Sequence, residues 1–183
     1  MHPEPDAQLK NFDAGIQRAQ ASGAHLLVSP FPDPVGKNAI IQFPGGVNTQ
    51  VYWHTTAPLH KPLKTVPENR AYGSPDAVNA FLRSYLGFTG GSITSDAKQA
   101  DASDIGLSGK TYRRIALSSP FRKTVIVVTN GHLPYPFGRE ITGYQVAHLS
   151  DTLRKAKSAD AKVLWGPQRA AGGNSAILKF PGG

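Results

Sequence analysis

The chain has 183 residues, of which 39% are hydrophobic, and it carries a formal net charge of +8. That length and composition can bury a real core, which excludes a disordered chain. The absence of cysteine excludes disulfides, thiolate nucleophiles and cysteine-based metal sites. The chain starts without an apolar signal segment, and its longest aliphatic run, residues 125–128, is too short to cross a bilayer. We therefore expect a soluble, cytoplasmic protein with no membrane partner.

The positive charge could indicate a nucleic-acid-binding protein, so its distribution matters. The Lys and Arg residues are scattered, with clusters only at Arg113-Arg114 and along Arg154-Lys155-Lys157. The second cluster lies on a predicted helix whose other side is apolar, and we interpret it as a solvated face. The sequence thus predicts no nucleic-acid partner, while the basic charge favours anionic small molecules.

The first third of the chain predicts one helix followed by three strands. Residues 6–22 place Leu9, Phe12, Ile16 and Ala19 on one helical stripe that stops at a glycine. Strands are expected at residues 25–29, 39–43 and 47–54. We interpret residues 1–54 as a partial βαβββ unit without its opening strand, followed by a Pro-rich linker at 55–67.

The middle of the chain predicts a complete βαβββ unit over residues 68–130. A short strand at 69–72 precedes a helix capped by Ser74, with Pro75 as its first residue. After a strand near Ser92, residues 95–109 read as a polar, mobile loop, either a lid or a tolerant surface insertion. Strands at 111–118 and 123–129 complete the unit.

The last part predicts a second partial unit. Residues 131–142 form a crossover loop, and residues 143–183 give a strand at 143–149, a helix at 151–158 and strands at 162–165 and 175–180. This unit lacks its closing strand. Because partial units leave unpaired strand edges, we expect a homodimer, or a chain that is a fragment of a longer four-unit protein.

An internal repeat supports the division into units. Residues 24–46 recur without a gap as residues 161–183, and the two copies share Ala, Leu, Pro, Gly, Ala, Ile, Phe, Pro, Gly and Gly in register. A repeat of this length indicates one supersecondary unit used at least twice.

The unit order and two motifs resemble the vicinal oxygen chelate superfamily, which includes glyoxalase I, extradiol dioxygenases and bleomycin resistance proteins. Residues 74–88, SPDAVNAFLRSYLGF, are similar to that family's helix motif, and residues 43–51, FPGGVNTQV, to its turn before the last strand. The resemblance implies an α+β fold in which repeated βαβββ units form a cup-shaped, incompletely closed mixed β-barrel with helices outside. It also implies a small-molecule ligand inside the cup.

The strand at 47–54 is the best candidate for a wall of that cup. Alternation puts Asn48, Gln50, Tyr52 and His54 on one face, which is unusually polar for a strand. Such a face either contacts a ligand or simply meets water. The candidate substrate-binding residues are Asn48, Gln50, Tyr52, Tyr112 and Tyr144.

In the family, metal ligands come from the opening and last strands of each unit. The positions of this sequence that correspond to the family's metal ligands are Gln50 and the vicinities of Glu68 and Tyr144. Gln is a weaker ligand than Glu and Tyr is uncommon, so the pattern departs from the family's. Further candidate metal ligands are His54, His60 and His132.

Two functions follow from the resemblance. In the first, a divalent ion (Zn, Ni, Mn or Fe) held by Gln50, His54 and Glu68 supports lyase, isomerase or dioxygenase chemistry, with Glu68 moving a proton. In the alternative, a metal-free cup sequesters a small molecule or antibiotic, as bleomycin resistance proteins do. The aromatic residues that suit this alternative are Tyr52, Trp53, Tyr72 and Tyr112.

Overall fold

The computed structural model describes residues 5–34, 36–55, 68–120, 122–138, 141, 143–170 and 173–182. These residues form an α+β protein, as predicted, and none of the sheets that they build closes into a barrel. Within the same ranges, no helix is both long enough and apolar enough to cross a membrane.

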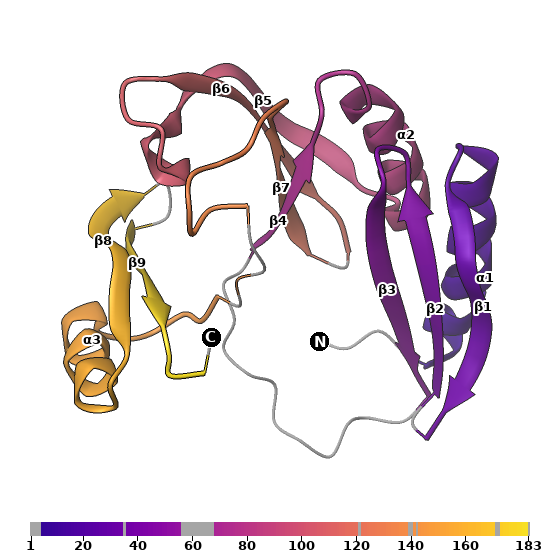
Figure 1. Cartoon of the computed structure of the whole chain (residues 1–183). Helices are drawn as coiled ribbons and strands as arrows, with labels where there is room; N and C mark the ends of the chain where they lie inside the picture. The colour runs from indigo at the N-terminus through magenta and orange to yellow at the C-terminus, as the bar shows by residue number, and fades with distance from the viewer. Residues whose placement is uncertain are drawn as a thin grey trace. The chain divides into compact units, whose positions relative to one another are not determined.

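The N-terminal elements are a helix and a three-stranded antiparallel sheet (Figure 1). Helix α1 spans Pro5–Ala21, and the strands are β1 (His25–Asp33), β2 (Gly36–Phe43) and β3 (Val47–His54), in the order β1-β2-β3. The turn between β2 and β3 is closed by a hydrogen bond from the Gly46 amide to the Phe43 carbonyl (3.1 Å). Strands β1 and β2 are longer than the sequence predicts, because their pairing continues as far as Asp33 and Gly36.

The middle elements form a mixed four-stranded sheet in the order β4-β7-β6-β5. Their bounds are β4 (Glu68–Gly73), α2 (Val78–Thr89), β5 (Ser92–Asp101), the 3₁₀ helix η1 (Ala102–Ile105), β6 (Thr111–Ser118) and β7 (Lys123–Val128). Strand β4 runs parallel to β7, and β6 runs antiparallel to β7. A helix connects β4 to the rest of the sheet, as a parallel pairing requires.

The C-terminal elements are helix α3 (Leu149–Ser158) and the antiparallel hairpin of β8 (Lys162–Ala170) and β9 (Gly173–Lys179). Chain contacts divide the protein into two compact bodies. The first body contains α1, β1 to β4, α2, β7 and most of β5 and β6. The second contains η1 with the adjoining strand ends, α3, β8 and β9.

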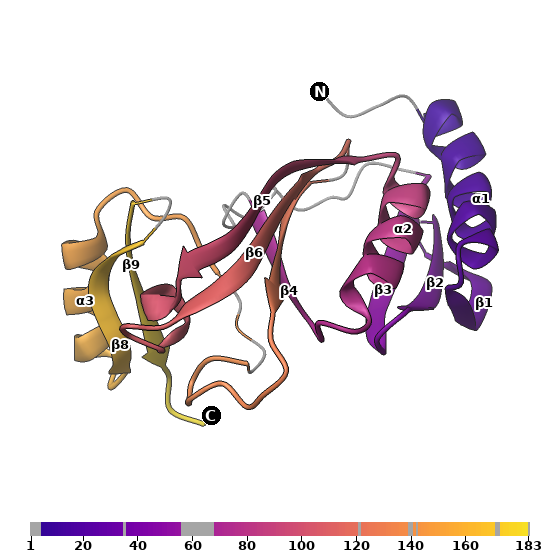
Figure 2. The same cartoon turned by 90° about the horizontal axis from the view of Figure 1, so that it is seen from above.

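The core of the first body lies between the two sheets and their helices. Helices α1 and α2 lie along the same face of the β1–β2–β3 sheet (Figures 1 and 2). The buried stripes are Phe12, Ile16 and Ala19 on α1 and Val78, Phe81, Leu82, Tyr85 and Phe88 on α2. Phe12, Ile16 and Ala19 confirm the predicted stripe of α1, while the side chain of Leu9 lies outside the described residues. In both helices the buried residues are three and four apart and so share one helix face.

The two helices pack closely because small residues face each other. A Cβ added to Gly15 would lie 3.2 Å from the Phe88 ring, so the α1 backbone approaches that ring directly. The Ser84 hydroxyl donates to the Ala19 carbonyl (3.0 Å). Arg18 Nε donates to the Gly87 carbonyl (2.8 Å) and thereby satisfies a carbonyl in the last turn of α2.

The sequence repeat is also a structural repeat. The pairs of β1 with β2 are His25↔Gln42, Leu26↔Ile41, Val28↔Ile40, Phe31↔Asn38, Pro32↔Lys37 and Asp33↔Gly36. The pairs of β8 with β9 are Lys162↔Lys179, Val163↔Leu178, Trp165↔Ile177, Gln168↔Ser175, Arg169↔Asn174 and Ala170↔Gly173. Each pair of the second hairpin is the corresponding pair of the first moved along the chain by one constant interval. Both register shifts also coincide.

The equivalence includes the helix that precedes each hairpin. The Ala24 amide donates to the Ala19 carbonyl (2.9 Å), and the equivalent Ala161 amide donates to the Ala156 carbonyl (3.0 Å). We call α1, β1 and β2 the first repeat, and α3, β8 and β9 the second repeat.

Three predicted local structures are wrong. The polar segment expected to be a loop at 95–109 continues β5 as far as Asp101 and then forms η1, so it is not a lid. It is ordered because β5 is bonded to β6, for example from Thr94 Oγ1 to the Ala116 carbonyl (3.1 Å). Where residues 143–149 are described they form no strand, only a single bridge at Tyr144, and α3 starts at Leu149.

The third correction concerns the start of α2. The helix begins at Val78, not at Pro75, and the residues between them form a turn. Ser74 organises that turn, since its hydroxyl oxygen accepts from the Ala77 amide (3.3 Å). The predicted cap residue therefore acts one turn earlier than expected.

Candidate functional site

Strand β3 has the two faces that alternation predicts. Val51 and Trp53 are buried in the core, while Asn48, Gln50 and Tyr52 are exposed. Trp53, which the sequence also suggested for a ligand cup, is on the core face, where its ring lies 6.4 Å from that of Phe12. The polar side of the sheet is thus its open face.

The register of the sheet places three side chains in one row across that open face. Tyr52 of β3 lies opposite Asn38 of β2, and Asn38 lies opposite Phe31 of β1. Directly opposed residues in antiparallel strands point to the same face. The two rings are 58% and 39% exposed, whereas Asn38 between them is buried. The row thus consists of a buried amide with an aromatic side chain on each side of it.

The dimensions of this row follow from strand spacing. Two neighbouring strands lie about 4.8 Å apart, so β1 and β3 are separated by roughly 9.6 Å. The Phe31 and Tyr52 rings stand on either side of Asn38, which is buried, so the two rings are what this row presents to a ligand.

The row beside it contains a glycine that the fold requires. Gly36 lies opposite His54, and a Cβ added to Gly36 would overlap the Trp53 carbonyl oxygen. No other residue is tolerated there without a backbone shift. The Tyr52 and His54 rings meet edge to face, with centroids 6.2 Å apart.

Further polar groups extend the open face in the other direction. Gln50 lies opposite Ile40, and Asn48 lies opposite Gln42. Gln42 Nε2 donates to Asn48 Oδ1 (3.0 Å), which fixes the orientation of both amides. These amides, a phenol and an imidazole can exchange hydrogen bonds with a ligand.

Four of the predicted site residues are therefore on one surface: Asn48, Gln50, Tyr52 and His54. Glu68 is the first residue of β4, but its side chain lies outside the described residues, and so does all of His60. Tyr112 and Tyr144 belong to the second body. Tyr112 is buried, with its hydroxyl donating to Asp104 Oδ2 (3.3 Å), while Tyr144 is exposed. Glu68 as a proton acceptor stays a prediction.

Sequence reasoning missed Phe31, Asn38 and Gly36. Asn38, Ile40 and Gln42 alternate with Ala39, Ile41 and Phe43, so the polar side of β2 was visible in the sequence. The row with Phe31 was not, because two register shifts in β1 decide which of its residues lies opposite Asn38.

The geometry does not fit a metal ion shared by Gln50 and His54. The two residues are four positions apart on one extended strand, so their Cα atoms are roughly 13 Å apart. Tyr52 stands between them on the same face. Among the described residues, no group of three His, Asp or Glu side chains is placed to hold a metal ion.

No protein-family model matches the sequence, and a search of the curated proteins found no match. The resemblance to the vicinal oxygen chelate superfamily therefore remains a prediction from its motifs and unit order.

Proposed function

We propose that this chain is a glyoxalase-like small-molecule-binding protein whose ligand lies on the open face of the β1–β2–β3 sheet. One observation carries the proposal, namely the row of Phe31, Asn38 and Tyr52. An exposed face usually shows scattered polar side chains, whereas here two half-open rings flank a buried amide. In this proposal, the row is part of the inner wall of the cup that the family resemblance implies.

The chemistry of the face selects the class of ligand. Its side chains offer amide, phenol and imidazole groups rather than a cluster of charges. We propose a planar, single-ring organic molecule with hydroxyl or amide substituents. Its ring packs against Phe31 and Tyr52, and its polar substituents bond to Gln42 or Gln50.

The proposal favours binding without a resident metal ion. Gln50 and His54 are too far apart along β3 to hold one ion together. A metal-dependent lyase, isomerase or dioxygenase remains the competing proposal, and it needs Glu68 and ligands other than this pair. Metal analysis of the purified protein separates the two: a stoichiometric divalent ion would favour the enzyme.

Ligand-observed NMR with a library of phenols, catechols and aromatic amides tests the site. We expect several of these compounds to bind, and Tyr52→Ala to weaken their binding about tenfold, since one aromatic contact contributes roughly 1–1.5 kcal/mol. Tyr135→Ala is the matched control, because Tyr135 is similarly exposed (62%) and belongs to the second body.

Two results would count against this function. The first is a library with no binders. The second is a set of binders that Tyr52→Ala and Phe31→Ala leave unchanged, which would place the ligand elsewhere on the chain.

A further inference from the structure

The two repeats have the same backbone but differ in what covers them. In the first repeat, helix α2 packs over the end of the hairpin. Phe43, at the end of β2, is only 1% exposed and contacts the rings of Phe81, Tyr85 and Phe88, with centroids 5.8, 5.4 and 5.9 Å away. The turn that follows is also covered, because a Cβ on Gly45 would lie 3.0 Å from Ala77 Cβ, next to the start of α2.

The equivalent surface of the second repeat is open. Phe180, the counterpart of Phe43, is 54% exposed. Gly182, the counterpart of Gly45, has the same left-handed backbone, with φ of 99° against 89°, but no atom of the described residues lies within 4 Å of a Cβ added to it. Val163 is exposed as well, whereas its counterpart Leu26 is partly buried against the core.

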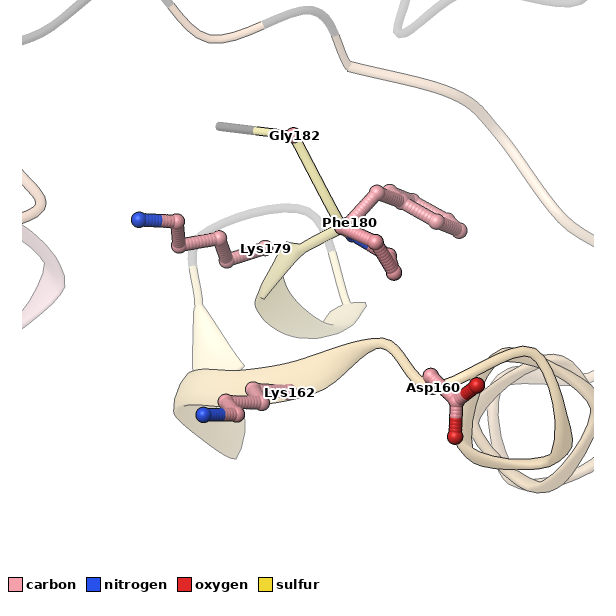
Figure 3. A pocket seen from close by; sticks show the side chains of 6 residues that line it. Asp160, Lys162, Lys179, Phe180 and Gly182 are labelled. Carbon is pink, nitrogen blue, oxygen red and sulfur yellow. The ribbon is translucent and has the colours of Figure 1, made fainter.

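A cavity of about 520 Å³ lies at this end of the second repeat (Figure 3). Its lining residues are Asp160, Lys162, Lys179, Phe180, Pro181 and Gly182. Their counterparts in the first repeat include Phe43 and Gly45, the residues that α2 covers. The side of the cavity formed by Phe180 and Gly182 therefore corresponds to a surface that α2 covers in the first repeat. A unit of a repeat protein cannot bury its apolar face alone, so an open face of this kind calls for a neighbour.

We infer that the second repeat docks an amphipathic helix of the α2 type, supplied by another polypeptide. The chain's own α2 is not available, because Phe81, Tyr85 and Phe88 are buried in the first body. The partner helix presents aromatic residues at the spacing of those three and packs their rings on Phe180. This is the helix-in-groove form of recognition, with anchors three and four residues apart.

The charges of the second repeat refine the description of the partner. Lys155 stands where Arg18 donates to a carbonyl in the last turn of α2, so it can donate to the last turn of the partner helix. Lys162 and Lys179 are directly opposite each other in the hairpin and extend to the same side (Figure 3). Their counterparts are His25 and Gln42, and Gln42 lies on the open face of the first sheet, away from the face of Phe43 that α2 covers. This lysine pair is therefore not part of the surface that receives the helix.

A synthetic α2 peptide tests the surface. The probe has the sequence of residues 74–90, with a hydrocarbon staple joining positions 79 and 83, whose side chains are exposed on α2. We expect the labelled peptide to bind the full chain in fluorescence anisotropy. Phe180→Ala should weaken binding at least tenfold. Lys155→Glu should weaken it several-fold and in a salt-dependent manner, because it replaces the donor to the last turn of the peptide helix.

Controls keep each outcome interpretable. Ile93→Ala, a change at an exposed apolar residue of the first body, should leave peptide binding unchanged, and circular dichroism checks that every variant is folded. A peptide with Ala at the Phe81 and Tyr85 positions should not bind. Absence of binding, or equal binding by Phe180→Ala, would overturn the inference. Self-association of the wild type that Phe180→Glu abolishes, with no peptide binding, would assign the surface to a second copy and also overturn it.

Discussion

Asp160 stands in the second repeat where Gly23 stands in the first, and both have left-handed backbone, with φ of 59° and 95°. Both residues follow a helix, and the amides of the next residues, Ala161 and Ala24, return to equivalent helix carbonyls. Glycine adopts this conformation without strain, whereas an L side chain meets its own carbonyl. We expect Asp160→Gly to stabilise the second body by about 0.5–1 kcal/mol.

Native-state hydrogen exchange measures that change without assuming that the two bodies unfold together. Protection in α3 and β8 should increase while protection in α1 and β1 stays constant. Gly23→Asp is the reciprocal variant and should lower protection in the first body. A neutral or destabilising Asp160→Gly would mean that the carboxylate makes a favourable interaction that outweighs the backbone strain.

The hydroxyl groups of Tyr85 and Thr124 join α2 to β7 inside the core (3.1 Å). Thr124→Val leaves the buried Tyr85 hydroxyl without this partner, and we expect a loss of about 1–2 kcal/mol in the free energy of unfolding. Combining it with Tyr85→Phe removes both polar groups and should recover much of that loss. Denaturant titration of the two single variants and the double variant gives the coupling energy. Simple additivity would show that the bond contributes nothing.

Asp96 of β5 binds two cations on the sheet surface. Arg113 donates to it through Nε (2.8 Å) and Nη2 (2.7 Å), and Lys98 through Nζ (2.6 Å). These bonds, those of Arg113 first, lower the pKa of the Asp96 carboxyl far below its usual value. A lowered folded-state pKa stabilises the protein above the unfolded pKa of about 4, and this contribution is lost as the pH falls below it.

Asp96→Asn should therefore cost about 1 kcal/mol at neutral pH, because the pair is bidentate but partly exposed. The difference in unfolding free energy between wild type and variant should shrink between about pH 4 and pH 2. Lys98→Ala should have a smaller effect, since that side chain is 64% exposed. A difference that does not depend on pH would mean that Asp96 acts through packing rather than charge.

Gln50→Glu distinguishes the two proposed functions. At the family's carboxylate position, a restored Glu should tighten binding of a divalent ion by a few kcal/mol if Glu68 or another residue completes the site. The spacing of Gln50 and His54 along β3 leads us to expect no such tightening in calorimetric titrations with zinc, nickel, manganese and iron. Strong binding gained by Gln50→Glu would reverse that view and favour the metal-dependent enzyme.

Sequence periodicity predicted the helices and strands that bury one of their faces. The stripe of Phe12, Ile16 and Ala19 and the alternation of β3 are both present, because a half-buried element must repeat its apolar residues at its own period. The repeat was equally visible, because it is a match between two segments of one sequence and can be found without knowing any contact. These features gave the polar face that became the candidate site.

Periodicity could not predict elements whose stability comes from their neighbours. Strand β5 is at the edge of its sheet and carries polar residues on both faces, so its sequence shows no alternation. Tyr144 and Val146 alternate like a strand, yet both are exposed, because alternation supplies no partner strand. The row of Phe31, Asn38 and Tyr52 depends on bulges in β1, which no local pattern specifies.

Phe43 and Phe180 are equivalent residues of two repeats with the same backbone. They differ in whether a helix packs on the ring, as α2 does on Phe43. Phe43→Ala removes a ring held by three aromatic contacts, and we expect it to destabilise the first body by about 3–5 kcal/mol. Phe180→Ala should change the stability of the second body by less than about 0.5 kcal/mol, because its ring is mostly in solvent. Hydrogen exchange in β2 and β9 measures the two effects separately. A large loss with Phe180→Ala in the isolated chain would show that this ring is already packed, and the second repeat would then have no open place for a partner helix.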